Sequence, residues 1–276
     1  YRLLDEINKN PMPNLELNIN SNLGANPKLF DRFIEKLKPI IEEKKVKEFK
    51  LFTSIDTWDK DKAEYIRNGL DVELFERNLN KYLTEIKDSK VSLMITFNNL
   101  CVTNFDSLLE QILVWRKKYN NKTAKDRGNI NQLIPLQRIQ MDTPYLKEPP
   151  HYDMNILPKD DFTHHMDRHL EFMINSKDDE DNNKFKTLEV EKFRRVVDYF
   201  KSAKVDEDYL RKGRSDFYNF FFEHDRRRNT DFIKAFPEYE EFYISCRNNS
   251  TKTQRAIRLE QRRAEMMRRK QNDKVD

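Results

Sequence analysis

A chain of 276 residues that is 37% hydrophobic and 12% aromatic has enough apolar material for the core of one large domain or two ordinary ones. Its 52 Lys and Arg residues against 48 Asp and Glu leave a net charge of only +4, which excludes a strong overall bias toward nucleic acid or anionic membranes. Two cysteines are too few for a disulfide framework or a cysteine-only metal site, and no apolar run reaches membrane-spanning length. Without a signal-peptide pattern at its start, the sequence predicts a cytoplasmic protein.

The first 146 residues alternate β-rich runs with amphipathic helical patterns. Strands are predicted over residues 15–19, 46–53, 91–97 and 136–141, and helices with apolar faces follow the first three strands. The first of these helices opens on Asn26 as N-cap and Pro27 in its first turn. Strands that alternate with helices predict a parallel sheet, and the periodicity leaves open whether it is an open sheet or a barrel. A helical pattern before the first strand runs from Tyr1 to Pro11 and is expected to be the end of a longer helix.

The character of the sequence changes near residue 149. Prolines punctuate the chain there, no strand pattern follows, and helices are predicted over 160–176, 187–203, 206–224 and 230–246. From residue 250 onward the chain is charged and basic, as a helix or a disordered tail would be. We therefore expect a β/α core over 1–148, a helical region over 149–249 and a basic tail over 250–276.

The carboxyl ends of the predicted strands carry polar residues. In parallel β/α folds these ends meet at one edge of the sheet, where binding and catalytic groups gather. The polar residues at the four ends are Asn20, Ser21, Asn22, Ser54, Asp56, Asn98, Asn99, Asp142, Thr143 and Tyr145. Such a set suits a ligand with hydroxyl, amide and amino-acid groups better than a hydrolytic triad, because no histidine precedes position 151. The alternative is that these residues only terminate strands and cap helices. The long connection over 57–71, with Gly69 in a turn, is expected to be an ordered loop over this edge.

One group of residues resembles a known family. Ser54-Ile55-Asp56, followed by the stretch 64–69 and then by Phe75 and Asn78, resembles the fourth-strand region of radical S-adenosylmethionine (radical SAM) enzymes. Ser21-Asn22 resembles the end of that family's third strand. The longer stretches 13–23, 51–54, 217–221 and 223–228 resemble the twitch-domain-containing radical SAM proteins, and the resemblance spans residues 1–247.

The resemblance implies an α/β fold that is the C-terminal portion of a partial (β/α) barrel of parallel strands, followed by a helical C-terminal region. It implies that Ser54 and Asp56 contact the amino-acid or ribose part of S-adenosylmethionine and that Asn98 contacts the ribose or carboxylate. Asn20 and Asn22 would lie near the methionine end. The parent would be a radical SAM enzyme that uses a 4Fe–4S cluster and S-adenosylmethionine on an unidentified small-molecule or peptide substrate.

The sequence departs from this family in one important respect. The family's Cys-x-x-x-Cys-x-x-Cys motif, whose thiolates bind the cluster, and its Gly-Gly-Glu-Pro stretch are both absent from the sequence. The expectation is therefore an N-terminally truncated piece that is inactive by itself. The competing hypothesis is a catalytically silent β/α scaffold that binds a protein or nucleic acid through its helical and basic C-terminal regions, without membrane contact.

Three other groups of residues have side chains that occur in metal, catalytic or polyanion-binding sites. His165 and His169, near His164, have the i, i+4 spacing to share a metal with Asp160 or Asp161, but a solvated helix face is favoured. Glu223-His224-Asp225 has the residue types of a general base beside an anion site, although the phenylalanines before it favour a structural role. The tail from 255 to 270 is basic enough to bind a polyanion, but it lacks aromatic residues for base stacking.

Overall fold

Four strands form one parallel sheet in this computed structural model, which describes residues 1–276 except 88, 120–136, 251–254 and 256–276. The strands are β1 (Met12–Asn20), β2 (Val46–Ser54), β3 (Lys90–Met94) and β4 (Ile139–Asp142). They lie side by side in chain order, β1-β2-β3-β4, and every neighbouring pair is parallel. The prediction of an α/β fold with a parallel sheet is confirmed.

Helices connect the strands as the periodicity predicted. Helix α1 (Arg2–Lys9) precedes β1, α2 (Pro27–Glu42) follows it, and α4 (Val72–Glu85) and α5 (Phe105–Tyr119) follow β2 and β3. The Asn26 side chain accepts a hydrogen bond from the backbone N–H of Leu29 at 3.0 Å, so it caps α2 as expected. An apolar stripe on each helix packs toward the sheet, because this is the surface that both elements must bury.

The two faces of β2 differ in burial. Its side chains alternate, with Phe49, Leu51 and Thr53 buried and the residues between them only partly covered. Such alternation is unusual for a parallel sheet, whose strands are commonly covered on both faces and apolar throughout. One face therefore belongs to the core, and the other carries polar side chains.

The structure differs from the prediction in the connection over 57–71 and at the end of β3. The connection over 57–71 contains a helix, α3 (Lys60–Ile66), where a loop was expected, because Asp59 caps it by accepting from the backbone N–H of Lys62. Strand β3 ends at Met94 rather than at 97. Phe97 forms only an isolated bridge to Tyr145, since the chain turns at Asn98 into the short helix η1 (Asn99–Cys101).

Gly69 has a φ of 81°, as its position in a turn predicted. The strand predicted over 136–141 is observed as Ile139–Asp142, and residue 136 lies outside the described residues.

The second half of the described chain is helical. It begins with two 3-10 turns, η3 (Pro150–Tyr152) and η4 (Met154–Ile156), and continues with α6 (Lys159–Asn175), α7 (Thr187–Ser202) and α8 (Glu207–Arg228). The single helix predicted over 230–246 is instead divided into α9 (Phe232–Ala235), η5 (Pro237–Tyr239) and a helix from 240 to 250, because Pro237 interrupts the helical pattern.

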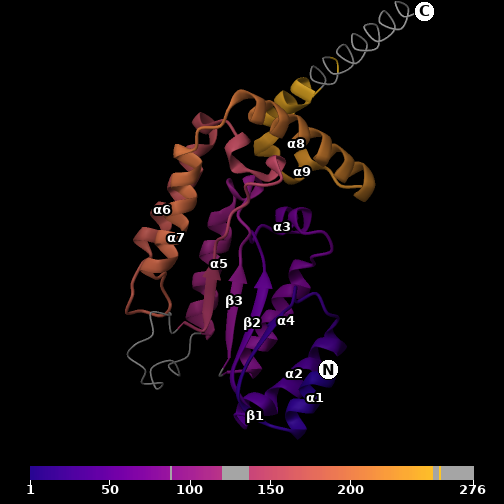
Figure 1. The fold of residues 1–276 in the computed structure, drawn as a ribbon, viewed down its shortest axis with the longest axis vertical. Coiled ribbons are helices and arrows are strands. Elements are labelled where there is room, and N and C mark those ends of the chain that lie inside the picture. Colours follow the sequence, from indigo (N-terminus) through magenta and orange to yellow (C-terminus); the bar gives the residue numbers. More distant parts are fainter. Residues whose placement is uncertain (88, 120–136, 251–254, 256–276) are drawn as a thin grey trace, which may run out of the picture.

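The helical half lies beside α5 and beyond the carboxyl ends of the strands. In Figure 1, α6 and α7 stand beside α5, while α8 and α9 lie beyond the arrowheads of the strands, close to α3. The buried apolar residues form one cluster that runs from Leu4 to Cys246 and so joins the two halves. No helix in the described ranges is long and apolar enough to cross a membrane. The predicted basic tail lies almost entirely outside the described residues.

Candidate functional site on the polar face of the sheet

The predicted site residues do not all have the same environment. Asn20 and Ser54 lie at the carboxyl ends of β1 and β2 on the same face of the sheet, because Asn20 is the register partner of Phe52. Asn20 is exposed and Ser54 is partly covered, and neither side chain makes a hydrogen bond to another described residue. These two side chains are available to a ligand.

Asp56 lies just beyond the end of β2 and is only 3% exposed. Its carboxylate contacts the Arg67 guanidinium twice, with Nε 2.7 Å from Oδ2 and Nη2 2.9 Å from Oδ1. Oδ1 also accepts a hydrogen bond from the backbone N–H of Thr96, at 2.9 Å. Burial raises the pKa of the Asp56 carboxyl above its ordinary value, while Arg67 and the Thr96 N–H act in the opposite direction. The Asp56 carboxylate is therefore already bonded to Arg67 and Thr96. These bonds link the end of β2 to the end of β3 and to the end of α3.

The remaining two predicted residues also make local contacts. The amide of Asn98, 3% exposed, donates to the backbone oxygen of Thr96 and accepts from the N–H of Leu100, which caps η1. The Asn22 side chain is exposed and accepts from the N–H of Gly24. Asn98 and Asn22 therefore shape the backbone at the strand ends, which was the alternative reading of these residues.

We expect Asp56→Ala to lower the free energy of unfolding by about 1–3 kcal/mol, since it leaves a guanidinium and a buried N–H without their acceptor. Asp56→Asn should lower it less, because the amide oxygen still accepts one bond. Urea unfolding followed by circular dichroism measures both. Asp61→Ala, an exposed aspartate of α3, is the control and should change stability by less than about 0.5 kcal/mol. An equally small effect of Asp56→Ala would contradict the role assigned to this carboxylate.

The polar face carries charged residues that, except for Asp142, were not among the residues predicted at the strand ends. Register places Lys50 of β2 beside Lys90 of β3, and Phe52 beside Ser92, which in turn lies beside Gln140 of β4. Lys90 pairs with Glu48 at 2.6 Å, and Asp142 pairs with Lys192 of α7 at 2.8 Å. The sequence does contain a signal for this polar face. Polar residues such as Glu48 and Lys50 stand at alternate positions of β2, whereas strands covered on both faces are apolar at every position.

The histidines of α6 do not form the metal site that was considered. Within the described part of the chain, no group of three or more His, Cys, Asp and Glu side chains is placed to hold a metal ion. His169 is buried, with Nε2 2.8 Å from the backbone oxygen of Val102, so the prediction of a solvated helix face was wrong for this residue. His164 and His165 lie on more exposed positions of the helix.

The segment around His224 has a structural role. Asp225 accepts hydrogen bonds from the hydroxyl of Tyr65, from the hydroxyl of Thr230 and from the backbone N–H of Phe232. It therefore fastens the end of α8 to α3 and α9, and the structural interpretation of this segment is supported. Of the three phenylalanines before it, Phe221 is buried and the other two are exposed.

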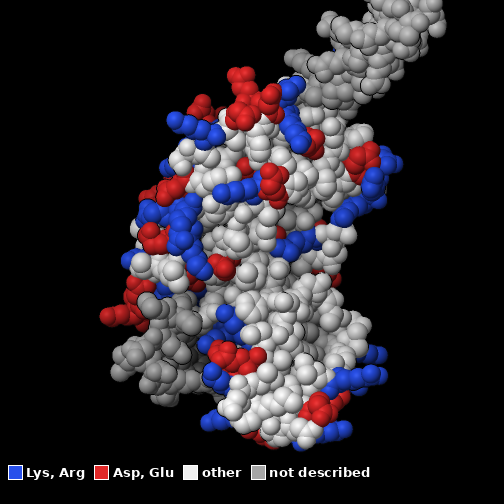
Figure 2. Space-filling model, in the orientation of Figure 1, with Lys and Arg blue, Asp and Glu red and all other residues white. Residues whose placement is uncertain are grey.

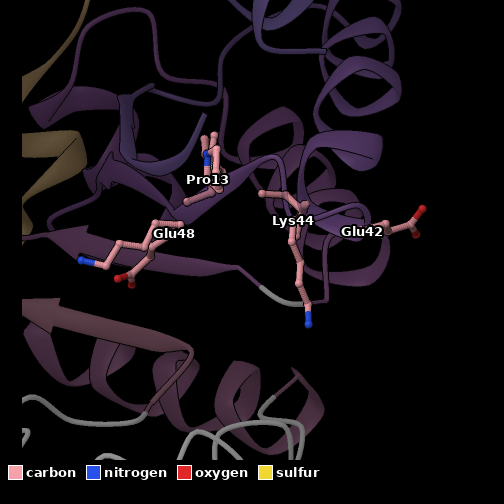
Figure 3. Close-up of a pocket in the computed structure, with 8 residues that line it drawn as sticks. Pro13, Glu42, Lys44 and Glu48 are labelled. Carbon is pink, nitrogen blue, oxygen red and sulfur yellow. The ribbon is translucent and has the colours of Figure 1, made fainter. Parts of the chain in front are cut away.

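Two hollows lie at the edges of the sheet. One, at the amino end of β2, is lined by Pro13, Lys44, Glu48 and neighbouring residues (Figure 3). In that view the charged ends of Glu42 and Lys44 point in different directions, so they do not converge on a ligand. The second hollow, lined by apolar residues of α1 and α2, includes Asn20 and Ser21. Figure 2 shows basic and acidic side chains intermingled over the face in view, without one large area of a single sign.

No family model, no curated protein and no solved structure matches this chain.

Proposed function

We propose that this chain is the later part of a partial (β/α) barrel and that it binds S-adenosylmethionine at the carboxyl ends of its strands, within a radical SAM enzyme. The order of the strands is the observation that carries the proposal. In doubly wound sheets the strand order reverses and helices cover both faces, whereas in barrels the strands follow in chain order around a separate inner face. Here the order is β1-β2-β3-β4 and one face is polar.

The predicted site residues would have two different roles: some would contact the ligand, and others would hold the backbone at the strand ends. Asn20 and Ser54 would contact the ligand, because their side chains have no other hydrogen bond to a described residue and share one face. Asp56 and Asn98 would act through the backbone that they hold, since their polar atoms are already bonded to protein groups. This revises the contacts that the family resemblance implies for Asp56, Asn98 and Asn22.

The described residues do not fit a 4Fe–4S cluster. The family's cluster is held by three cysteine thiolates, and this chain has two cysteines, Cys101 and Cys246, both buried. Burial raises the pKa of the Cys101 thiol well above its ordinary range and that of Cys246 to about 12, so both thiols stay protonated. The proposal therefore assigns to this chain the binding of the nucleoside and amino-acid groups, and no step of radical chemistry.

The test is equilibrium binding of S-adenosylmethionine to the chain by calorimetry. We expect saturable binding that Ser54→Ala and Asn20→Ala each weaken by about 5–10-fold, the effect of one lost hydrogen bond. Ser202→Ala is the matched control, because this serine lies at the end of α7 and bonds only to the backbone of Asp198. Absence of saturable binding, or binding that neither variant changes, would overturn the proposal.

The competing proposal is a catalytically silent scaffold that binds a protein or nucleic acid through its helical and basic C-terminal regions. Its basic segment lies outside the described residues except for Arg255, so binding of nucleic acid or protein there stays a prediction.

A further inference from the structure

The ring of Phe222 on α8 is exposed to solvent and is held in place from one side. The side chain is 49% exposed. Its ring stacks on Tyr218, one helical turn earlier, with the ring centres 5.8 Å apart and an angle of 27° between the planes. Tyr218 packs in turn on Tyr243 of the helix over 240–250, at 5.1 Å. Because these contacts fix the orientation of the ring, a ligand that stacks on Phe222 restricts its side chain little further.

The basic C-terminal segment begins beside this ring. The hydroxyl of Ser250 donates a hydrogen bond to Oδ1 of Asn219, at 3.0 Å. Asn219 precedes Phe222 by three positions, so the two side chains are neighbours on the surface of α8. Figure 1 shows the helix that ends at residue 250 next to α8, with the chain continuing from there toward its C-terminus. The basic segment therefore starts within about one helical turn of the Phe222 ring.

Positive charge dominates the chain from this point onward. Between residues 255 and 270 the sequence has six arginines and one lysine against two glutamates. Arg247 and Arg255, which the structure describes, are both exposed. The exposed Glu240 and Glu241 lie at the start of the last helix, roughly two to three turns from its C-terminal end. A polyanion is the ligand that such a segment complements.

An exposed aromatic ring beside a basic segment is the combination by which many proteins bind single-stranded nucleic acid. Arginine and lysine neutralise the phosphates, and the bases stack on aromatic rings, because every base has a π-face. The segment from 255 to 270 contains no aromatic residue, and α8 supplies the ring that it lacks. A base-paired duplex keeps its bases stacked inside, so it offers no free base to Phe222.

We propose that single-stranded nucleic acid binds this chain with a base stacked on Phe222 and with neighbouring phosphates on the basic segment that follows Ser250. RNA and DNA share the chemistry that this site recognises. The site gives the scaffold proposal one specific ligand and one described contact. It uses neither Asn20 nor Ser54 and requires no S-adenosylmethionine, so it can succeed or fail independently of the function proposed above.

Fluorescence anisotropy of labelled oligonucleotides tests the proposal on the full chain. The probes are oligouridylate and oligothymidylate of about 20 nucleotides and a DNA duplex of the same length. We expect saturable binding of at least one single strand, and the tighter of the two identifies RNA or DNA as the source. Phe222→Ala should weaken this binding by about tenfold, the effect of one lost stacking contact. The same variant should leave the affinity for the duplex unchanged.

Three further variants separate stacking from apolar contact. Phe220→Ala is the matched control, because Phe220 is 37% exposed but lies on the opposite side of α8, where it stacks on His151. Its affinity should stay within about twofold of the wild type. Phe222→Leu keeps an apolar side chain without a ring, so it should bind as weakly as Phe222→Ala, whereas Phe222→Trp should bind at least as tightly as the wild type. Circular dichroism verifies that each variant is folded.

The charged part of the site is tested by replacing four arginines of the basic segment with glutamine: Arg262, Arg263, Arg268 and Arg269. Each lost phosphate contact lowers the slope of log affinity against log salt by about 0.7 for a single strand. The fourfold variant should therefore flatten this slope by up to about 3 between about 50 and 200 mM potassium chloride.

Four outcomes would overturn the proposal. They are no saturable binding of either single strand, wild-type affinity of Phe222→Ala for single strands, an unchanged salt slope in the arginine variant, and wild-type affinity of Phe222→Leu. The last result would mean that Phe222 acts only as an apolar surface, which a protein partner would cover equally well.

Discussion

Replacing Glu189 with glutamine is expected to lower the free energy of unfolding by about 3–5 kcal/mol, because it leaves the charge of Arg116 buried without a partner. Arg116 is 0% exposed and Glu189 is 5% exposed, and the two approach to 2.6 Å. The same guanidinium donates to the backbone oxygens of Ile139 in β4 and of Lys184. It thus connects α5, β4 and α7 at one point, and Glu189 provides its counter-charge.

A double-mutant cycle separates this electrostatic effect from simple loss of contacts. Because the double variant Arg116→Met with Glu189→Gln contains no unpaired buried charge, it should be no less stable than Glu189→Gln alone. Glu191→Gln is the matched control on the same helix. Its side chain is exposed and pairs with Arg194, so the expected change is below about 0.5 kcal/mol. Chemical unfolding is measured for the single variants Glu189→Gln and Arg116→Met, for the double variant and for Glu191→Gln. Strictly additive effects of the two substitutions would contradict a buried ion pair.

Acid is expected to destabilise the protein through His169. Burial lowers the pKa of this imidazole from 6.5 to about 4, while its bond to Val102 and the nearby Asp106 oppose the shift. Between these two values the unfolded chain binds the proton and the folded chain does not. The contribution of His169 is therefore complete above pH 6.5 and is lost as the pH falls toward 4, and it amounts to roughly 3 kcal/mol.

The measurement compares unfolding free energies at pH 7 and pH 4.5 in the wild type and in His169→Gln. A glutamine still reaches the carbonyl of Val102 with a donor but does not titrate, so the loss of stability on acidification should be smaller by roughly 2–3 kcal/mol. His164→Gln, an exposed position of the same helix, should keep the acid sensitivity of the wild type. The same dependence on pH in all three proteins would exclude His169 as its source.

Local sequence patterns predicted much of the fold. Alternation of apolar residues located the strands. The cap at Asn26 and the turn at Gly69 involve only a few neighbouring residues, so they follow from local preferences of the backbone. The boundaries predicted least well were those at which local and distant contacts compete. Strand β3 ends at Met94 because Asp56, 40 residues earlier, takes up the N–H of Thr96.

The candidate site was predicted only in part, since a sequence shows which polar residues follow a strand but not which of them are already bonded. Asp56 and Asn98 follow the ends of β2 and β3, but their polar atoms are bonded to Arg67, Thr96 and Leu100. Among the residues that the structure describes, none forms a hydrogen bond with the side chain of Asn20 or Ser54. The resemblance to radical SAM proteins indicates the edge of the sheet at which the strands end, but it carries no information on these bonds.

By itself the sequence determined the class of fold, the approximate positions of the strands and helices, and the absence of the cluster motif from this chain. Only the tertiary structure decided which charges meet. The ion pair of Arg116 with Glu189 joins residues 73 positions apart, and the bond from Lys50 to Gln140 spans 90 positions. The physical reason is that side-chain pairing across a sheet depends on the order and register of strands, and local preferences do not set either.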